Sequence, residues 1–247
     1  MKKLFVVFAA LISMASSAQA LPMLQLDILG GSYDTTTETI IAPGSSFTLY
    51  ALFTPKCNTT DSTIAALLTQ NYYISAAITP KTETPGANAG SFSFNGAPVK
   101  VTGDMVYGIP PLEAIIAKDS GDLARHDVFE TYFKEFTFKF APGNTMSPYN
   151  TQDRAINKGA IPPTGGVGQY WMAFNVDTSL LTPGYGIHFD LYSEKTKAGD
   201  IDVNQFAPFS HDAQSGGAPV PEPSTILLLG AGLLGFAIYG KRRINNV

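Results

Sequence analysis

The sequence predicts a mainly β fold: an antiparallel β-sandwich, jelly-roll or immunoglobulin-like, with two short helices. Seven segments alternate apolar and polar side chains with a period of two, which is typical of strands that bury one face. Turns containing Gly or Pro separate these segments, and only two short stretches have helical character. Two sheets packed on each other are the simplest way to bury the apolar faces.

The expected strands are four to eight residues long. In the segment 133–140, Phe136, Phe138 and Phe140 share one face, opposite the polar residues between them. This pattern places the phenylalanines in a core and the polar side chains in water. The seven expected strands are 23–29, 46–53, 72–79, 91–94, 133–140, 170–176 and 186–192.

Two segments are expected to form helices. The first, 61–70, has Asp61 or Ser62 in position to act as the N-cap. The second, 111–118, begins with proline, which is favoured in the first helical turn. Neither helix is long enough to cover a sheet, so the predicted core lies between the two sheets.

The N-terminus has the pattern of a secretory signal peptide over residues 1–20. Lys2 and Lys3 precede an unbroken apolar run over 4–12, and the run leads to the A-x-A pattern of Ala18 and Ala20. Cleavage is expected after Ala20. The alternative, an uncleaved anchor, fits less well because the apolar run is short.

A second apolar segment, 224–240, lies near the C-terminus and is followed by the basic tip Lys241, Arg242 and Arg243. As a helix, 17 residues extend about 25 Å, slightly less than a hydrocarbon core. Basic side chains favour the cytoplasmic side. The segment is therefore predicted to span the inner membrane, with residues 241–243 inside and the body outside.

Between body and span lies an expected flexible linker, 211–220, rich in small residues, and then Pro221-Glu222-Pro223. Two prolines fix φ and remove two backbone donors, so the tripeptide cannot be helical and is expected to be extended. An extended peptide beside a membrane helix is accessible to a processing enzyme.

The tripeptide, the short glycine-containing apolar segment and the basic tip, all at the end of the chain, resemble the PEP-CTERM sorting domain. That signal is found in Gram-negative bacteria that make extracellular polymeric substance. For residues 221–247, the resemblance implies recognition by an exosortase, a membrane-embedded enzyme, and removal of the tail. It also implies that Glu222 is the acidic residue read by the enzyme, with Pro221 and Pro223 fixing its presentation.

The body expected over 21–210 is long enough for one sizeable core. Over residues 21–220, which add the expected linker to this body, there are 11 basic and 19 acidic residues, a net charge of about −8. This charge disfavours nucleic acid as a partner, because phosphate binding needs a basic surface.

Cys57 is the only cysteine, so the chain has no intramolecular disulfide. A free thiol is the simplest interpretation, and an intermolecular disulfide is the alternative.

None of the three histidines lies in a recognised catalytic motif. His126 lies in a polar connector, and His211 precedes Asp212 just before the linker. His188 and Asp190 are expected on the wet face of the strand 186–192. Such a pair can bind a metal or a sugar, although a solvated surface pair is the simpler interpretation.

Asp200, Asp202 and Asn204 alternate, so their oxygens could converge on Ca²⁺, which prefers oxygen ligands. The EF-hand pattern fails there, because Gln205 and His211 stand where that loop has Gly and Glu. A polar edge after the last strand is the alternative. No other cofactor is expected.

The sequence does not predict an enzyme. It has no G-x-S-x-G, H-E-x-x-H or phosphate-loop motif. Glycosidase chemistry needs only two carboxylates about 5–9 Å apart, and the acidic body permits such a pair. A secreted polysaccharide hydrolase therefore stays open as an alternative.

The start and end of the body, "LPMLQLDILGGSYDTTTETI" and "GDIDVNQFAPFSHD", also resemble the choice-of-anchor N domain proteins. That group has no established activity, and the resemblance implies a cell-surface or matrix module.

The sequence therefore predicts an exported, non-catalytic structural or adhesive protein that contacts extracellular polysaccharide. Tyr72, Tyr73 and Trp171 are expected to be exposed for stacking on sugar rings. A simple membrane-anchored protein with an uncleaved tail is the third alternative.

Overall fold

The computed structural model describes residues 23–80, 82, 85–86, 88–118, 130–153, 165–199, 202 and 205–216. The predicted signal peptide and the predicted sorting segment, 221–247, lie outside these ranges. Within the described ranges, no helix has both the length and the apolar character needed to cross a membrane.

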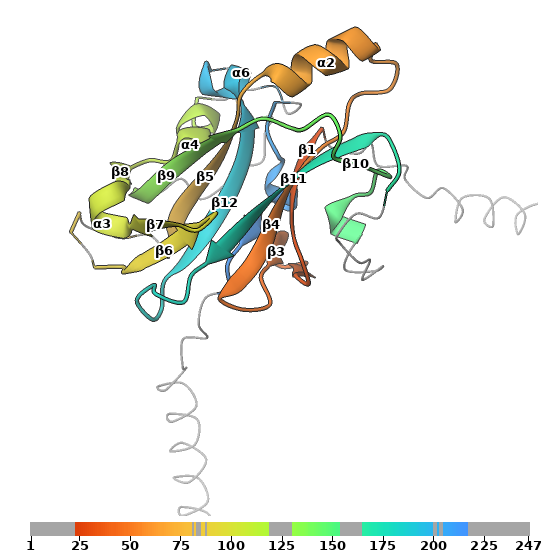
Figure 1. Ribbon diagram of the computed structural model, residues 1–247. Helices are drawn as coiled ribbons and strands as arrows, with labels where there is room; N and C mark the ends of the chain where they lie inside the picture. Colours follow the sequence, from red (N-terminus) through yellow and green to blue (C-terminus); the bar gives the residue numbers. More distant parts are fainter. Residues whose placement is uncertain are drawn as a thin grey trace, which may run out of the picture.

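The described chain forms two β-sheets (Figure 1). The first sheet has the order β1-β4-β11-β6-β7, with β10 beside β11. Its strands are β1 Leu24–Ile28, β4 Ser46–Phe53, β6 Ser91–Phe94, β7 Ala97–Lys100, β10 Thr145–Met146 and β11 Gln169–Asp177. All its pairings are antiparallel.

The second sheet has the order β2-β3-β13-β12-β5-β9-β8. Its strands are β2 Ser32–Asp34, β3 Thr39–Ile41, β5 Tyr72–Thr79, β8 Val106–Gly108, β9 Thr131–Phe138, β12 Gly186–Ser193 and β13 Ala213–Gln214. One pair, β13 with β3, is parallel, which departs from the all-antiparallel prediction. The helical segments are α2 Asp61–Thr69, α3 Val101–Asp104, α4 Pro111–Ile116, α6 Glu194–Lys197 and the 3₁₀ turns η1 Thr151–Asp153 and η3 Phe209–His211.

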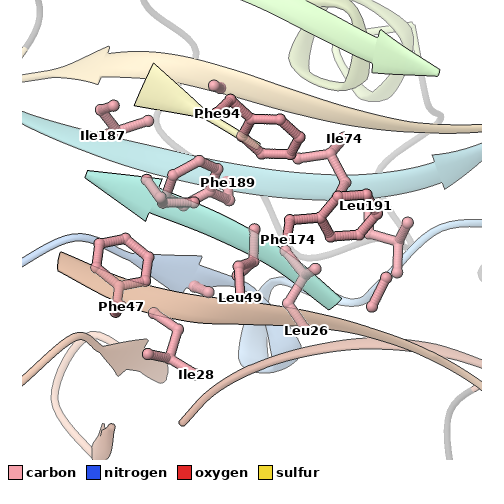
Figure 2. Packing of buried hydrophobic residues seen from close by; sticks show 14 of the residues in the cluster. Leu26, Ile28, Phe47, Leu49, Ile74, Phe94, Phe174, Ile187, Phe189 and Leu191 are labelled. Atoms are coloured by element: carbon pink, nitrogen blue, oxygen red, sulfur yellow. The ribbon is translucent and has the colours of Figure 1, made fainter. Parts of the chain in front are cut away.

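The two sheets share one apolar core, to which inward-facing side chains of both contribute (Figure 2). The ring of Phe47 on β4 meets that of Phe189 on β12 edge to face, with centroids 6.2 Å apart. Farther along, Phe94 on β6 stacks on Phe136 on β9 at 3.9 Å. Burying a side chain of this size stabilises the fold by about 1.5–3 kcal/mol. The face-to-face packing is thus the main source of stability in a chain whose one cysteine is exposed.

The mainly β class with two sheets and few helices is confirmed. Three expected strands, 46–53, 72–79 and 91–94, coincide with β4, β5 and β6. The finer assignment to a jelly-roll or immunoglobulin-like type stays a prediction.

The expectation of one wet face per strand is wrong for β1 and β12, in which every residue is buried. Covering segments explain the difference. Tyr149 donates a hydrogen bond to Asp27 of β1. On β12, Tyr192 lies in a second apolar cluster with Leu112 and Ile116 of α4. These strands are therefore covered on the outer face as well, which their period of two could not reveal.

Both expected helices form, with small changes at their ends. The N-cap of α2 is Thr60, not Asp61 or Ser62, because the Thr60 hydroxyl accepts a hydrogen bond from the backbone N–H of Thr63. A hydroxyl at this position satisfies an N–H that has no partner within the helix.

The last described residues belong to the folded domain. β13 lies between β3 and β12 in the interior of the second sheet. Ser215 reinforces it, because its hydroxyl accepts from the N–H of Ile187 at 2.7 Å and its N–H donates to the carbonyl of the same residue at 2.8 Å. The linker expected over 211–220 therefore begins no earlier than residue 217.

We expect Gly90→Ala to destabilise the fold by about 2 kcal/mol or more, because it combines a steric clash with backbone strain. Gly90 has φ +82°, and a Cβ there would lie 2.4 Å from the carbonyl oxygen of Leu180. Chemical denaturation measures the loss. The control is Gly44→Ala, where a Cβ would meet nothing within 4 Å. Equal midpoints for the two variants would contradict the prediction.

Candidate functional site

Most residues predicted to be functional lie outside the described ranges. They are Ala18, Ala20, Pro221, Glu222, Pro223, Lys241, Arg242, Arg243, Asp200, Asn204 and His126. Of the predicted calcium ligands, Asp202 is described and is exposed. Among the described residues, no group of three or more His, Cys, Asp or Glu side chains is arranged to hold a metal ion. A calcium site at 200–204 stays a prediction.

The structure brings the predicted pair, His188 and Asp190, together with Asp212 in a buried cluster. The Nε2 of His188 lies 3.2 Å from Oδ1 of Asp190 and 3.4 Å from Oδ2 of Asp212. All three side chains are buried, so the expectation of a solvated pair on a wet strand face is wrong. The hydrogen bond between Nε2 of His188 and the carboxylate of Asp190 is strong in a water-poor environment, and Asp212 lies within ion-pair distance of the same nitrogen.

The register of β13 on β12 creates this cluster. His188 pairs with Gln214 and Phe189 with Ala213, so the antiparallel pairing continues to place Asp212 beside Asp190. Residues opposite each other on paired strands project to the same face. The two carboxylates are 22 positions apart in the sequence, and the antiparallel pairing of β13 with β12 brings them together.

A second buried polar arrangement involves His211, which precedes Asp212 of this cluster in the sequence. The Nδ1 of His211 is 2.9 Å from the hydroxyl of Ser210, and its Nε2 is 2.7 Å from Oδ1 of Asn150. Because an amide oxygen only accepts, Nε2 carries the proton and Nδ1 accepts from Ser210. Burial lowers the pKa of His211 to about 4, so the ring is neutral at pH 7.

This geometry has a chemical and a structural meaning. A neutral imidazole that accepts from a hydroxyl polarises it, as a general base does. The same bonds fasten η3 to η1, because Asn150 immediately precedes η1. The sequence offered no signal for this contact, since Asn150 and His211 are 61 positions apart.

The aromatic residues expected to stack on sugars lie elsewhere than predicted. The prediction that Tyr72 is exposed is wrong, because its side chain is buried in the core. Tyr73 is half-buried, stacks on Tyr192 with centroids 5.7 Å apart, and has the Nζ of Lys197 4.5 Å from its ring centre. Trp171 is half-buried against Tyr50 at 5.9 Å. None of the three rings is therefore as exposed as predicted.

Glu135 joins the group around Tyr73. It accepts a hydrogen bond from the hydroxyl of Tyr192 at 2.6 Å and forms an ion pair with Lys197. Burial, together with the bond to Glu135, raises the pKa of Tyr192. The phenol thus stays protonated and serves as a donor, which favours a structural over an acid–base role.

Two grooves open on the described surface. One is lined by residues of the 41–45 segment, the 178–185 loop and Gly216. The other crosses the outer face of the first sheet and includes Thr48, Asn95, Asn175 and Asp177. The second groove presents hydroxyl, amide and carboxylate groups, which are the groups that hydrogen-bond to carbohydrate hydroxyls.

The described part is thus a two-sheet β domain, and the C-terminal segment follows its last strand in the sequence. Residues 219–243 of that segment match the PEP-CTERM protein-sorting motif. The match supports a PEP-CTERM protein that is exported and sorted to the cell envelope or surface in an exosortase-dependent manner. No curated protein and no solved structure matches the chain.

Proposed function

We propose that this protein is a surface or matrix module that an exosortase releases from the inner membrane by removing the tail. The match of residues 219–243 to the sorting motif carries this proposal. It supports the predicted topology, in which a signal peptide exports the body, residues 224–240 hold it in the membrane and the basic tip stays inside.

In this proposal the β domain is structural or adhesive, and its ligand is extracellular polysaccharide. The polar groove with Thr48, Asn95 and Asn175 supports this role better than the aromatic residues do. The acidic body favours a neutral or cation-bridged polymer over a polyanion. The resemblance to the choice-of-anchor N proteins agrees with a surface module.

We expect the native chain, isolated from its exosortase-bearing host, to end upstream of Val247 by intact-mass measurement. Glu222→Ala is expected to leave the full tail in place, because the acidic residue of the motif is lost. The matched control is Glu130→Ala, which removes an exposed carboxylate from the body. Wild-type protein that still ends at Val247 would contradict sorting and favour the simple membrane-anchored alternative.

The polysaccharide hydrolase remains the second candidate function, because glycosidase chemistry needs only a suitably spaced pair of carboxylates and the body is acidic. Incubation of the purified protein with the polysaccharide of its host separates the two. Retention on the polymer without new reducing ends supports the module. Release of reducing ends supports the hydrolase.

A further inference from the structure

The place where the folded domain ends is fixed by the second sheet. β13 is an interior strand, held by β12 on one side and β3 on the other. Beyond it, Gly216 fits so closely that a Cβ would lie 2.9 Å from the carbonyl oxygen of Ala42. Gly216 is therefore a fixed point from which the distance to the sorting motif can be bounded.

That distance is short. Five Cα-to-Cα steps lead from Gly216 to Pro221, so they span at most about 18 Å when fully extended. An α-helix with its side chains is about 10–12 Å across. The distance between Gly216 and Pro221 is therefore less than the width of two packed helices. An enzyme that surrounds Glu222 with helices on this side must reach the surface of the domain.

The surface at this point has a distinct chemistry. We name it the exit pole: residues 41–45, the loop 178–185 and Gly216. Of the described residues that line its groove, none carries a charge, although the body is acidic. The walls combine Pro43, Leu181 and Tyr185 with hydroxyl side chains. Leu180, in the same loop, is 73% exposed.

We propose that the exit pole contacts the outer face of the membrane-embedded sorting enzyme while the tail is processed. The inference rests on the proposed function, because it assumes that an exosortase acts on residues 219–243. It adds that the folded domain, besides the tail, is part of what the enzyme contacts. An uncharged surface suits this place, since it avoids repulsion between an acidic body and anionic headgroups.

The test compares two exposed apolar residues beyond opposite ends of β11, Leu180 and Val167. The nine residues of β11 keep these positions roughly 25 Å or more apart. In the full-length chain in its host, Leu180→Glu is expected to slow tail removal about tenfold, because it places a charge in the contact. Val167→Glu introduces the same charge away from the exit pole and is expected to leave the rate unchanged.

A second variant separates contact from misfolding. About 20 Gly and Ser residues inserted after Gly217 add a tether with an r.m.s. length of roughly 25 Å. With this insertion, Leu180→Glu is expected to be processed at the same rate as its parent. Equal rates for Leu180→Glu and Val167→Glu on the native tether would overturn the exit-pole contact, as would a slow rate that the insertion fails to restore. If even the wild type keeps Val247, the proposed function itself fails.

Discussion

Phe189→Ala is expected to lower the free energy of unfolding by about 3–5 kcal/mol, the range for removing a buried ring from a core. Phe189 has no exposed surface and lies on β12, between β13 and β5. Its ring also meets Phe47 across the two sheets. The substitution therefore removes the ring's burial, an aromatic pair and packing that the rigid sheets cannot replace. Domains typically have a free energy of unfolding of about 5–15 kcal/mol, so the expected loss is a large fraction of the total stability.

The measurement is urea unfolding, followed by circular dichroism, with the midpoint and slope compared between variants. Phe133→Ala is the matched control, because it removes the same atoms from a half-buried position on β9. Its expected cost is about 1–2 kcal/mol, in proportion to the smaller area withdrawn from water. Similar costs at both positions would show that the shared core between the sheets does not dominate stability.

Acidification is expected to destabilise the domain through His211, by about 3 kcal/mol between pH 6.5 and pH 4. Burial lowers the pKa of this ring to about 4 from 6.5. In that window the unfolded chain binds a proton that the folded chain does not. The His211 contribution to stability is therefore fully present above pH 6.5 and is lost as the pH falls to about 4.

His211→Gln isolates this contribution, because its amide can still donate to Asn150 but does not titrate. Carboxylates titrate in both proteins, so the difference between the two stability-against-pH curves reports the histidine. We expect the variant to lose less stability than the wild type over this window. An NMR titration of the wild-type imidazole provides a second measurement, and an apparent pKa near 6.5 would contradict the buried, neutral ring.

The alternation of side chains predicted the core strands well because it reflects a local rule. Every second residue of β4 and β5 must face the apolar interior. The same rule missed β2, β3 and β13, which are only two or three residues long. Strands of that length are too short to show a period, and they form here because a neighbouring strand offers hydrogen-bond partners.

The candidate site was harder to predict from the sequence, for a related reason. His188 and Asp190 were recognised as a pair, but their strand was expected to have a wet face. The third member, Asp212, was assigned to a flexible linker. Pairing of β13 with β3 joins segments 173 positions apart, and its pairing with β12 joins segments 24 to 26 positions apart, which local patterns do not encode.

The sequence by itself determined the class of the domain and the address at its C-terminus, because alternation, proline content and an apolar run with a basic tip are local properties. Only the tertiary structure decided that His188, Asp190 and Asp212 are buried together and that the domain extends to Gly216. The physical reason is that burial and strand pairing are set by which distant segments cover a surface. The short distance from the last strand to the sorting motif follows from that pairing.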